Sequence, residues 1–117
     1  MNEEELKQRT KQFALRVIKL VTALPKSREG DVIGRQLLRS ATSVGANYRA
    51  ACRARSTADF IAKIGLVEEE ADESLYWLEL IVEASLLPRV RVSALLREAN
   101  ELVAIFVATG HSAKKRK

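Results

Sequence analysis

Hydrophobic residues recur along this chain at intervals of three, four and seven positions, which is the spacing that places them on one face of an α-helix. The pattern falls into four segments, which we expect to be helices at Glu3–Leu24, Asp31–Ala54, Thr57–Leu87 and Arg89–Thr109. Short polar or proline-containing stretches separate them. Four amphipathic helices joined by short connections predict an all-α fold, an antiparallel up-down-up-down four-helix bundle.

Each segment carries a stripe of apolar residues that we expect to form the core. The stripes consist of Leu6, Phe13, Val17, Leu20 and Leu24, then Ile33, Leu37, Ala41, Val44, Tyr48 and Ala51, then Phe60, Ile64, Val67, Ala71, Leu75, Leu78 and Val82, and finally Val92, Leu95, Leu96, Ala99, Leu102, Val103 and Phe106. Asn2, Asp31 and either Ser56 or Thr57 stand at the positions of helix N-caps. Residues 40–47 are small and weak helix formers, so packing against a neighbouring helix must hold that stretch.

The longest predicted helix is apolar on two sides. Its later half carries a second apolar set opposite the main stripe, formed by Tyr76, Leu80, Ala84 and Leu87. Leu15 and Ile18 similarly lie opposite the stripe of the first helix. A small bundle cannot cover both sides of so long a helix, and a large exposed apolar surface is unusual on a monomer. We therefore expect the chain to self-associate, with the second apolar set of the third helix at the interface between copies.

Length and composition limit the organisation of the chain. Its 117 residues fit one domain, which we place at residues 1–110, with a basic tail at residues 111–117 that we expect to be disordered without a partner. The first residues are acidic and no apolar stretch approaches the roughly 20 residues of a membrane span. A single cysteine suits a reducing compartment. We expect a cytoplasmic protein that has no membrane partner.

The residues that support catalysis or metal binding are scarce. The chain has one cysteine, Cys52, and one histidine, His111, which excludes a disulfide framework, a cysteine-rich zinc module and any site that needs two imidazoles. It contains no glycine-rich phosphate loop of the known types. We expect no catalytic residues, no metal and no cofactor, and hence a protein that is not an enzyme.

Arginines follow one face of the second predicted helix. Arg35 and Arg53 are eighteen residues apart, which is five turns at about 3.6 residues per turn. Arg39 and Arg49 lie on either side of the line that joins them, and Arg55 extends it into the following loop. Guanidinium groups pair bidentately with phosphates and carboxylates. We refer to Arg35, Arg39, Arg49, Arg53 and Arg55 as the arginine face.

Two interpretations of the arginine face stay open. In the first, an oligomeric module binds RNA or DNA phosphates through these five arginines with low sequence specificity. In the second, the protein is an interaction scaffold for another protein, and its arginines pair with carboxylates of the same or an adjacent subunit. The third predicted helix supplies candidate carboxylates in Glu68, Glu69, Glu70, Asp72 and Glu73.

Several motifs resemble those of a known family. They are GRQLLRSATSVGANYR at residues 34–49, ACRARS at 51–56, FIAKIG at 60–65 and EEADESLYWLEL at 69–80. The chain resembles, from about Gln12 to Leu87, the small four-helix-bundle proteins encoded in intervening sequences of bacterial large-subunit ribosomal RNA. Many members have Pro-Ser before the asparagine and Glu-Gly shortly after it, whereas this chain has Gly45-Ala46 and Ala50-Ala51.

The resemblance implies a four-helix bundle that assembles as a homopentamer with a central opening and has no known catalytic activity. It also implies a relationship to the accessory protein of diversity-generating retroelements, a pentamer whose basic surface binds nucleic acid and a reverse transcriptase. Because the family has no catalytic motif, the resemblance assigns no catalytic residue to this chain. It favours the first interpretation of the arginine face.

Overall fold

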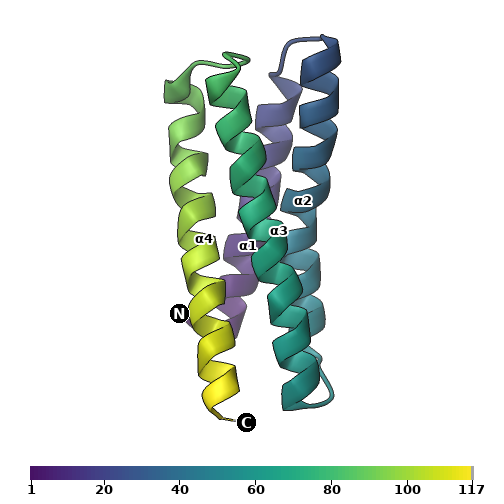
Figure 1. The fold of residues 1–117 in the computed structure, drawn as a ribbon, viewed down its shortest axis with the longest axis vertical. Coiled ribbons are helices and arrows are strands. Elements are labelled where there is room, and N and C mark those ends of the chain that lie inside the picture. The colour runs from purple at the N-terminus through teal and green to yellow at the C-terminus, as the bar shows by residue number, and fades with distance from the viewer. Residues whose placement is uncertain (117) are drawn as a thin grey trace.

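A computed structural model describes residues 1–116 of the chain and contains four α-helices. They are α1 (Glu3–Thr22), α2 (Arg28–Cys52), α3 (Thr57–Glu83) and α4 (Arg89–Lys115), and the described residues include no strand. Figure 1 shows the helices side by side along one long axis, with each loop turning the chain back along the preceding helix. The molecule measures 47 × 20 × 20 Å. The expectation of an all-α fold with four helices is confirmed.

The four apolar stripes meet in one core along the middle of the bundle. Every stripe residue is either buried or packed against the buried cluster, so the predicted core is confirmed. Helix α2 lies between α1 and α3, and α4 contacts α3 extensively but α1 more sparsely. The rings of Tyr48 on α2 and Phe106 on α4 meet with centroids 5.5 Å apart. This pair joins the two diagonal helices, whose backbones are not neighbours.

The starts of the helices follow from side chains that accept backbone hydrogen bonds. Asn2 accepts from the Glu5 N–H in a capping box, and Ser56 accepts from the Asp59 N–H, as the sequence predicts. The expected start of the second helix at Asp31 is wrong, because Ser27 caps α2 by accepting from the Gly30 N–H. Gly30 lies in the first turn rather than before it. A Cβ at Gly30 would stand 2.3 Å from the Pro25 carbonyl oxygen, so only glycine fits there.

Helix α3 ends earlier than its apolar pattern predicts. The expected end at Leu87 is wrong, because the chain leaves the helix after Glu83 through a residue in the left-handed conformation, Ser85, at φ 57°. The Leu86 N–H donates to the Ile81 carbonyl and the Ser85 N–H to the Val82 carbonyl, which is the Schellman pattern. Ala84 is therefore the C-cap, and Leu87 belongs to the loop.

Because α3 ends early, the four residues that we expected at an interface between copies differ in exposure. Leu87 is only 7% exposed and packs in the core of its own chain, so its expected place on the outer face is wrong. Leu80 is half-buried, whereas Tyr76 is 52% exposed and Ala84 is exposed. Large apolar side chains are exposed instead at scattered positions on several helices: Leu15, Ile18, Val32, Leu66, Tyr76 and Val90.

Helix α4 extends farther than the sequence predicts. We expected the fourth helix to end at Thr109, yet α4 continues to Lys115, so that helix end is wrong. Gly110 faces α3, because a Cβ built on it would lie in ordinary contact 3.6 Å from Ile64. Ala113, one turn later, is completely buried. The packing of these two small residues explains why the glycine does not stop the helix.

Candidate nucleic-acid interface

Four of the five residues of the arginine face are exposed and have no carboxylate partner within ion-pair distance among residues 1–116. These are Arg35, Arg49, Arg53 and Arg55. The Arg35 Nε–H donates to the Asp31 carbonyl of its own helix, at 3.3 Å. Helix α2 directs Arg35 and Arg49 away from the core because its buried residues all lie on the opposite side. These guanidinium groups are free to meet an external anion.

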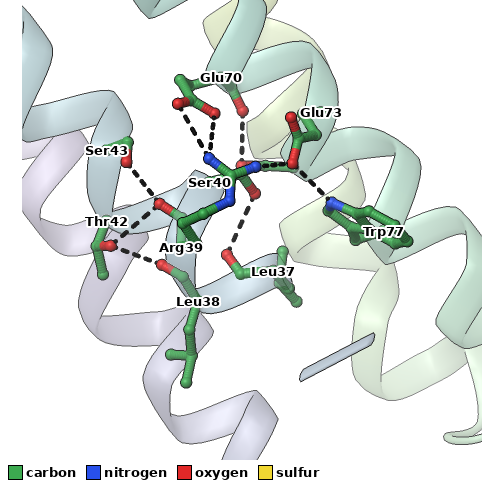
Figure 2. A network of polar contacts seen from close by, with 10 residues as sticks. Leu37, Leu38, Arg39, Ser40, Thr42, Ser43, Glu70, Glu73 and Trp77 are labelled. Carbon is green, nitrogen blue, oxygen red and sulfur yellow. Dashed lines mark hydrogen bonds and ion pairs between the residues drawn. The ribbon is translucent and has the colours of Figure 1, made fainter. Parts of the chain in front are cut away.

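Arg39 differs from the other four because it pairs with two carboxylates of α3. Figure 2 shows its guanidinium between Glu70 and Glu73, with the Glu70 pair at 3.2 Å. The Trp77 indole N–H donates to the same Glu73 carboxylate at 3.1 Å. Arg39 therefore fastens α2 to α3. This contact is the kind that our second interpretation expected for all five arginines.

Two buried hydroxyls lie directly beneath this ion pair. The Ser74 Oγ–H lies 2.9 Å from the Ser40 Oγ and 2.8 Å from the Glu70 carbonyl oxygen, and both serines are completely buried. A serine is small enough for two helices to approach closely, and its hydroxyl needs a partner when it is buried. The pair fixes how far α2 is shifted along α3, and thereby brings Arg39 level with Glu70 and Glu73.

The Glu73 contacts predict a pH dependence of stability. The Trp77 N–H and the Arg39 guanidinium lower the pKa of Glu73 from its ordinary 4.5. A carboxylate whose pKa is lower in the folded state stabilises the fold above its unfolded pKa, and this contribution disappears as the pH falls through the folded value. We expect urea unfolding between pH 6 and pH 3 to show a smaller loss of stability in Glu73→Gln than in the wild type.

Trp77→Phe provides the companion variant for this measurement, because it removes the N–H donor while it keeps an aromatic side chain and leaves the Glu73 carboxylate in place. It too should lose less stability on acidification than the wild type. Equal acid dependence in the wild type and Glu73→Gln would contradict the role of this network.

A second group of cations, which the sequence analysis missed, lies beside the arginine face. Lys7 and Lys11 of α1 line a hollow of about 250 Å³ together with Arg49 and Arg53 of α2. The sequence signal was available, since Lys7 and Lys11 are four residues apart and so share one side of a helix. Their proximity to α2 depends on how the two helices pack, which the spacing alone does not give.

The remaining charged cluster joins α1 to α4 and is structural. Arg9 pairs bidentately with Glu98, with both nitrogen–oxygen distances at 2.7 Å, and also reaches Glu101 at 2.7 Å. These contacts raise the pKa of Arg9, which stays charged. The cluster holds together α1 and α4, which have the sparsest contacts of the neighbouring helix pairs.

Other chemistry is sparse in the part of the chain that the structure describes. Burial raises the pKa of the half-buried Cys52 thiol, which lowers its thiolate fraction at neutral pH. No three histidine, cysteine, aspartate or glutamate side chains of residues 1–116 are grouped so that they could hold a metal ion. None of the described helices combines the length and apolar character needed to cross a membrane.

Comparison with known proteins identifies a family and a related crystal structure. The model of the 23S rRNA-intervening sequence protein family matches residues 2–108. The chain is also similar to a protein of unknown function from the S23 ribosomal protein family of Bacteroides thetaiotaomicron, known from a crystal structure at 1.70 Å resolution. The two are 32% identical and superpose with a TM-score of 0.86, over 95% of this chain and 99% of the other. No curated protein matches the chain significantly.

Proposed function

Because this chain belongs to the 23S rRNA-intervening sequence protein family, we propose that it is a non-enzymatic module that binds RNA or DNA phosphates through its arginine face. We expect low sequence specificity, since no motif of the sequence resembles a base-reading element. Arg35, Arg49, Arg53 and Arg55 contact phosphates. The observation that carries the proposal is the exposure of these four arginines without carboxylate partners among the described residues.

The distribution of charge supports a polyanion as the partner. Residues 57–88, which include α3, hold eight carboxylates against one lysine, whereas residues 31–56, which include α2, hold five arginines against one aspartate. The acidic helix neutralises one residue of the arginine face, Arg39, and leaves the others unpaired. A surface that keeps its cations unpaired beside an acidic helix attracts phosphates over the distance of a Debye length, about 8 Å at physiological salt.

The Arg39 contacts favour the scaffold interpretation for one residue only. Arg39 serves the junction between α2 and α3, and its part in binding phosphate is secondary. A scaffold function for the whole face would need partners for Arg35, Arg49, Arg53 and Arg55 on an adjacent subunit or on another protein. That alternative predicts a complex whose formation does not depend on nucleic acid.

Self-association is part of the proposal. The exposed apolar side chains of α1 and α3, including Leu15, Ile18, Leu66 and Tyr76, support contact between copies. The family resemblance supports a ring-like homopentamer of antiparallel bundles. A ring repeats each arginine face several times around one assembly, which strengthens binding to a long strand through multivalency. Size-exclusion chromatography with light scattering, with and without RNA, tests the subunit number.

Reversal of two exposed arginines provides the test of the function. We expect Arg49→Glu/Arg53→Glu to weaken binding of a fluorescently labelled 20-nucleotide RNA by about 100-fold, because two phosphate contacts become repulsive and fewer counterions are released. The measurement is fluorescence anisotropy at several salt concentrations.

The control for this experiment is Arg16→Glu/Lys19→Glu, which changes the net charge equally on the α1 surface that faces α4. This control should retain most of the wild-type affinity. Equal losses in the two variants, or wild-type binding that does not weaken as salt rises, would contradict the arginine face as the binding surface.

A further inference from the structure

Two adjoining hollows lie between α1 and α2 beside the arginine face. The first, of about 250 Å³, is lined by Glu4, Lys7, Gln8, Lys11, Arg49 and Arg53. The second, of about 190 Å³, adds Thr10, Ala14, Thr42, Gly45 and Ala46. The two hollows share Lys7, Lys11 and Arg49, and we refer to them together as the α1/α2 groove.

Cations line both walls of the α1/α2 groove. Lys7 and Lys11 are one turn apart on α1, and Arg49 and Arg53 are one turn apart at the end of α2. Glu4 is the one carboxylate that lines the same hollow as these four cations. Lys7 pairs with Glu3 and Glu4 at 3.3 and 3.4 Å, but the two glutamates are well exposed and such surface pairs contribute little. A phosphate can therefore replace the glutamates as the partner of Lys7.

Small residues make the floor of the α1/α2 groove low. A Cβ on Gly45 would lie only 3.2 Å from the Thr10 hydroxyl oxygen, so the backbones of α1 and α2 approach closely there. Ala14 and Ala46 add only methyl groups on either side. The long side chains of Lys7, Lys11 and Arg49 therefore extend beyond the short side chains at the base of the groove. Its two parts, of about 250 and 190 Å³, offer room for phosphates and sugars of one extended strand.

We propose that the α1/α2 groove binds the phosphodiester backbone of a single-stranded nucleic acid, with Lys7 and Lys11 on one side of the strand and Arg49 and Arg53 on the other. This inference rests on the proposed function and adds α1 to the binding surface. A positively charged groove that follows the backbone is the usual device for holding single strands without reading their sequence. The strand then crosses from the groove onto the remaining arginines of α2.

Removal of the α1 cations alone tests the groove. We expect Lys7→Gln/Lys11→Gln to bind a labelled 20-nucleotide single-stranded RNA about tenfold more weakly than the wild type at 100 mM salt. The slope of log affinity against log salt should become shallower by about 1.4, since each lost phosphate contact removes about 0.7 for single strands. The matched control, Arg16→Gln/Lys19→Gln, removes the same charge from another side of α1 and should lose less than about threefold. Circular dichroism checks that both variants stay helical.

The outcomes separate the groove from the wider function. Loss of affinity confined to the Lys7/Lys11 variant, and larger for the single strand than for a duplex of the same length, supports the groove. Equal losses in the two α1 variants, with strong wild-type binding, overturn the groove and leave the arginine face in place. An equally large loss for the duplex overturns the assignment to single strands. Absence of salt-dependent binding by the wild type overturns the proposed function, and the groove with it.

Discussion

Phe106→Ala is expected to lower the free energy of unfolding by about 3–5 kcal/mol, which is the usual cost of truncating a fully buried phenylalanine. Phe106 is completely buried and lies against the Tyr48 ring at the centre of the bundle. Its removal leaves a cavity between the diagonal helices α2 and α4. The rigid helices around that cavity can close it only in part, so the loss of packing adds to the loss of apolar burial. A typical domain has only about 5–15 kcal/mol of stability in total.

Urea unfolding followed by far-ultraviolet circular dichroism, at one fixed protein concentration, measures this loss. Phe106→Leu is the graded control, because it keeps most of the apolar volume and should cost about 1–1.5 kcal/mol. Phe60→Ala provides a second comparison. Because Phe60 is only half-buried, this substitution should lower the free energy of unfolding by less than Phe106→Ala does. A loss below about 1.5 kcal/mol for Phe106→Ala would contradict a well-packed centre.

Gly30→Ala is expected to cost about 2–3 kcal/mol, although alanine is the best helix former and Gly30 lies inside α2. The reason is steric. The new Cβ would stand 2.3 Å from the Pro25 carbonyl oxygen, which is a backbone atom and cannot rotate away. The loop between α1 and α2 must move, and with it the Ser27 cap that accepts from the Gly30 N–H.

Gly65→Ala is the control for Gly30→Ala, because a Cβ built at Gly65 has no atom within 4 Å other than those of its chain neighbours and the adjacent backbone of its own helix. The same substitution should there stabilise the protein by about 0.5–1 kcal/mol through helix propensity alone. The two variants should therefore shift the urea midpoint in opposite directions. A stabilising Gly30→Ala would show that the loop tolerates the extra methyl group.

The sequence predicts helices and their buried faces well because burial repeats with the helical period. Phe13, Val17, Leu37 and Leu102 were all placed in the core correctly from spacing alone. The ends of helices are harder, because the decisive contacts are specific. Gly110 is read from the sequence as a helix end, yet its contact with Ile64 shows why the helix continues.

The C-terminal end of α3 illustrates a second limit. The apolar residues after Glu83 continue the helical spacing, so periodicity alone extends the helix to Leu87. The Schellman turn at Ser85 ends it sooner, and serine is a rare choice for a left-handed position that glycine usually occupies. Leu87 then enters the core from a loop, which no helical pattern can predict.

The candidate site was only partly predictable for a related reason. The spacing of arginines on α2 is a property of a single helix, and it placed Arg35 and Arg49 on one face without deciding whether they are exposed or ion-paired. The partner of Arg39 and the contribution of Lys11 depend on which helices are neighbours and on their relative shift. The small residues at 40–47 indicate that α2 packs closely against a neighbour, but not which residues they meet. The hydrogen bond between Ser40 and Ser74 and the close approach of Gly45 to Thr10 set that shift.

The chain contains a single tryptophan, and its position makes it an intrinsic optical reporter of one particular junction. The Trp77 indole donates to Glu73, which also receives Arg39, so its emission responds to events where α2 meets α3. Stopped-flow refolding followed by tryptophan emission would therefore measure the rate at which α2 and α3 come into contact, rather than an average over the whole molecule. Comparison of this rate with the rate of helix formation measured by circular dichroism would show, without any added label, whether α2 and α3 meet before or after the helices form.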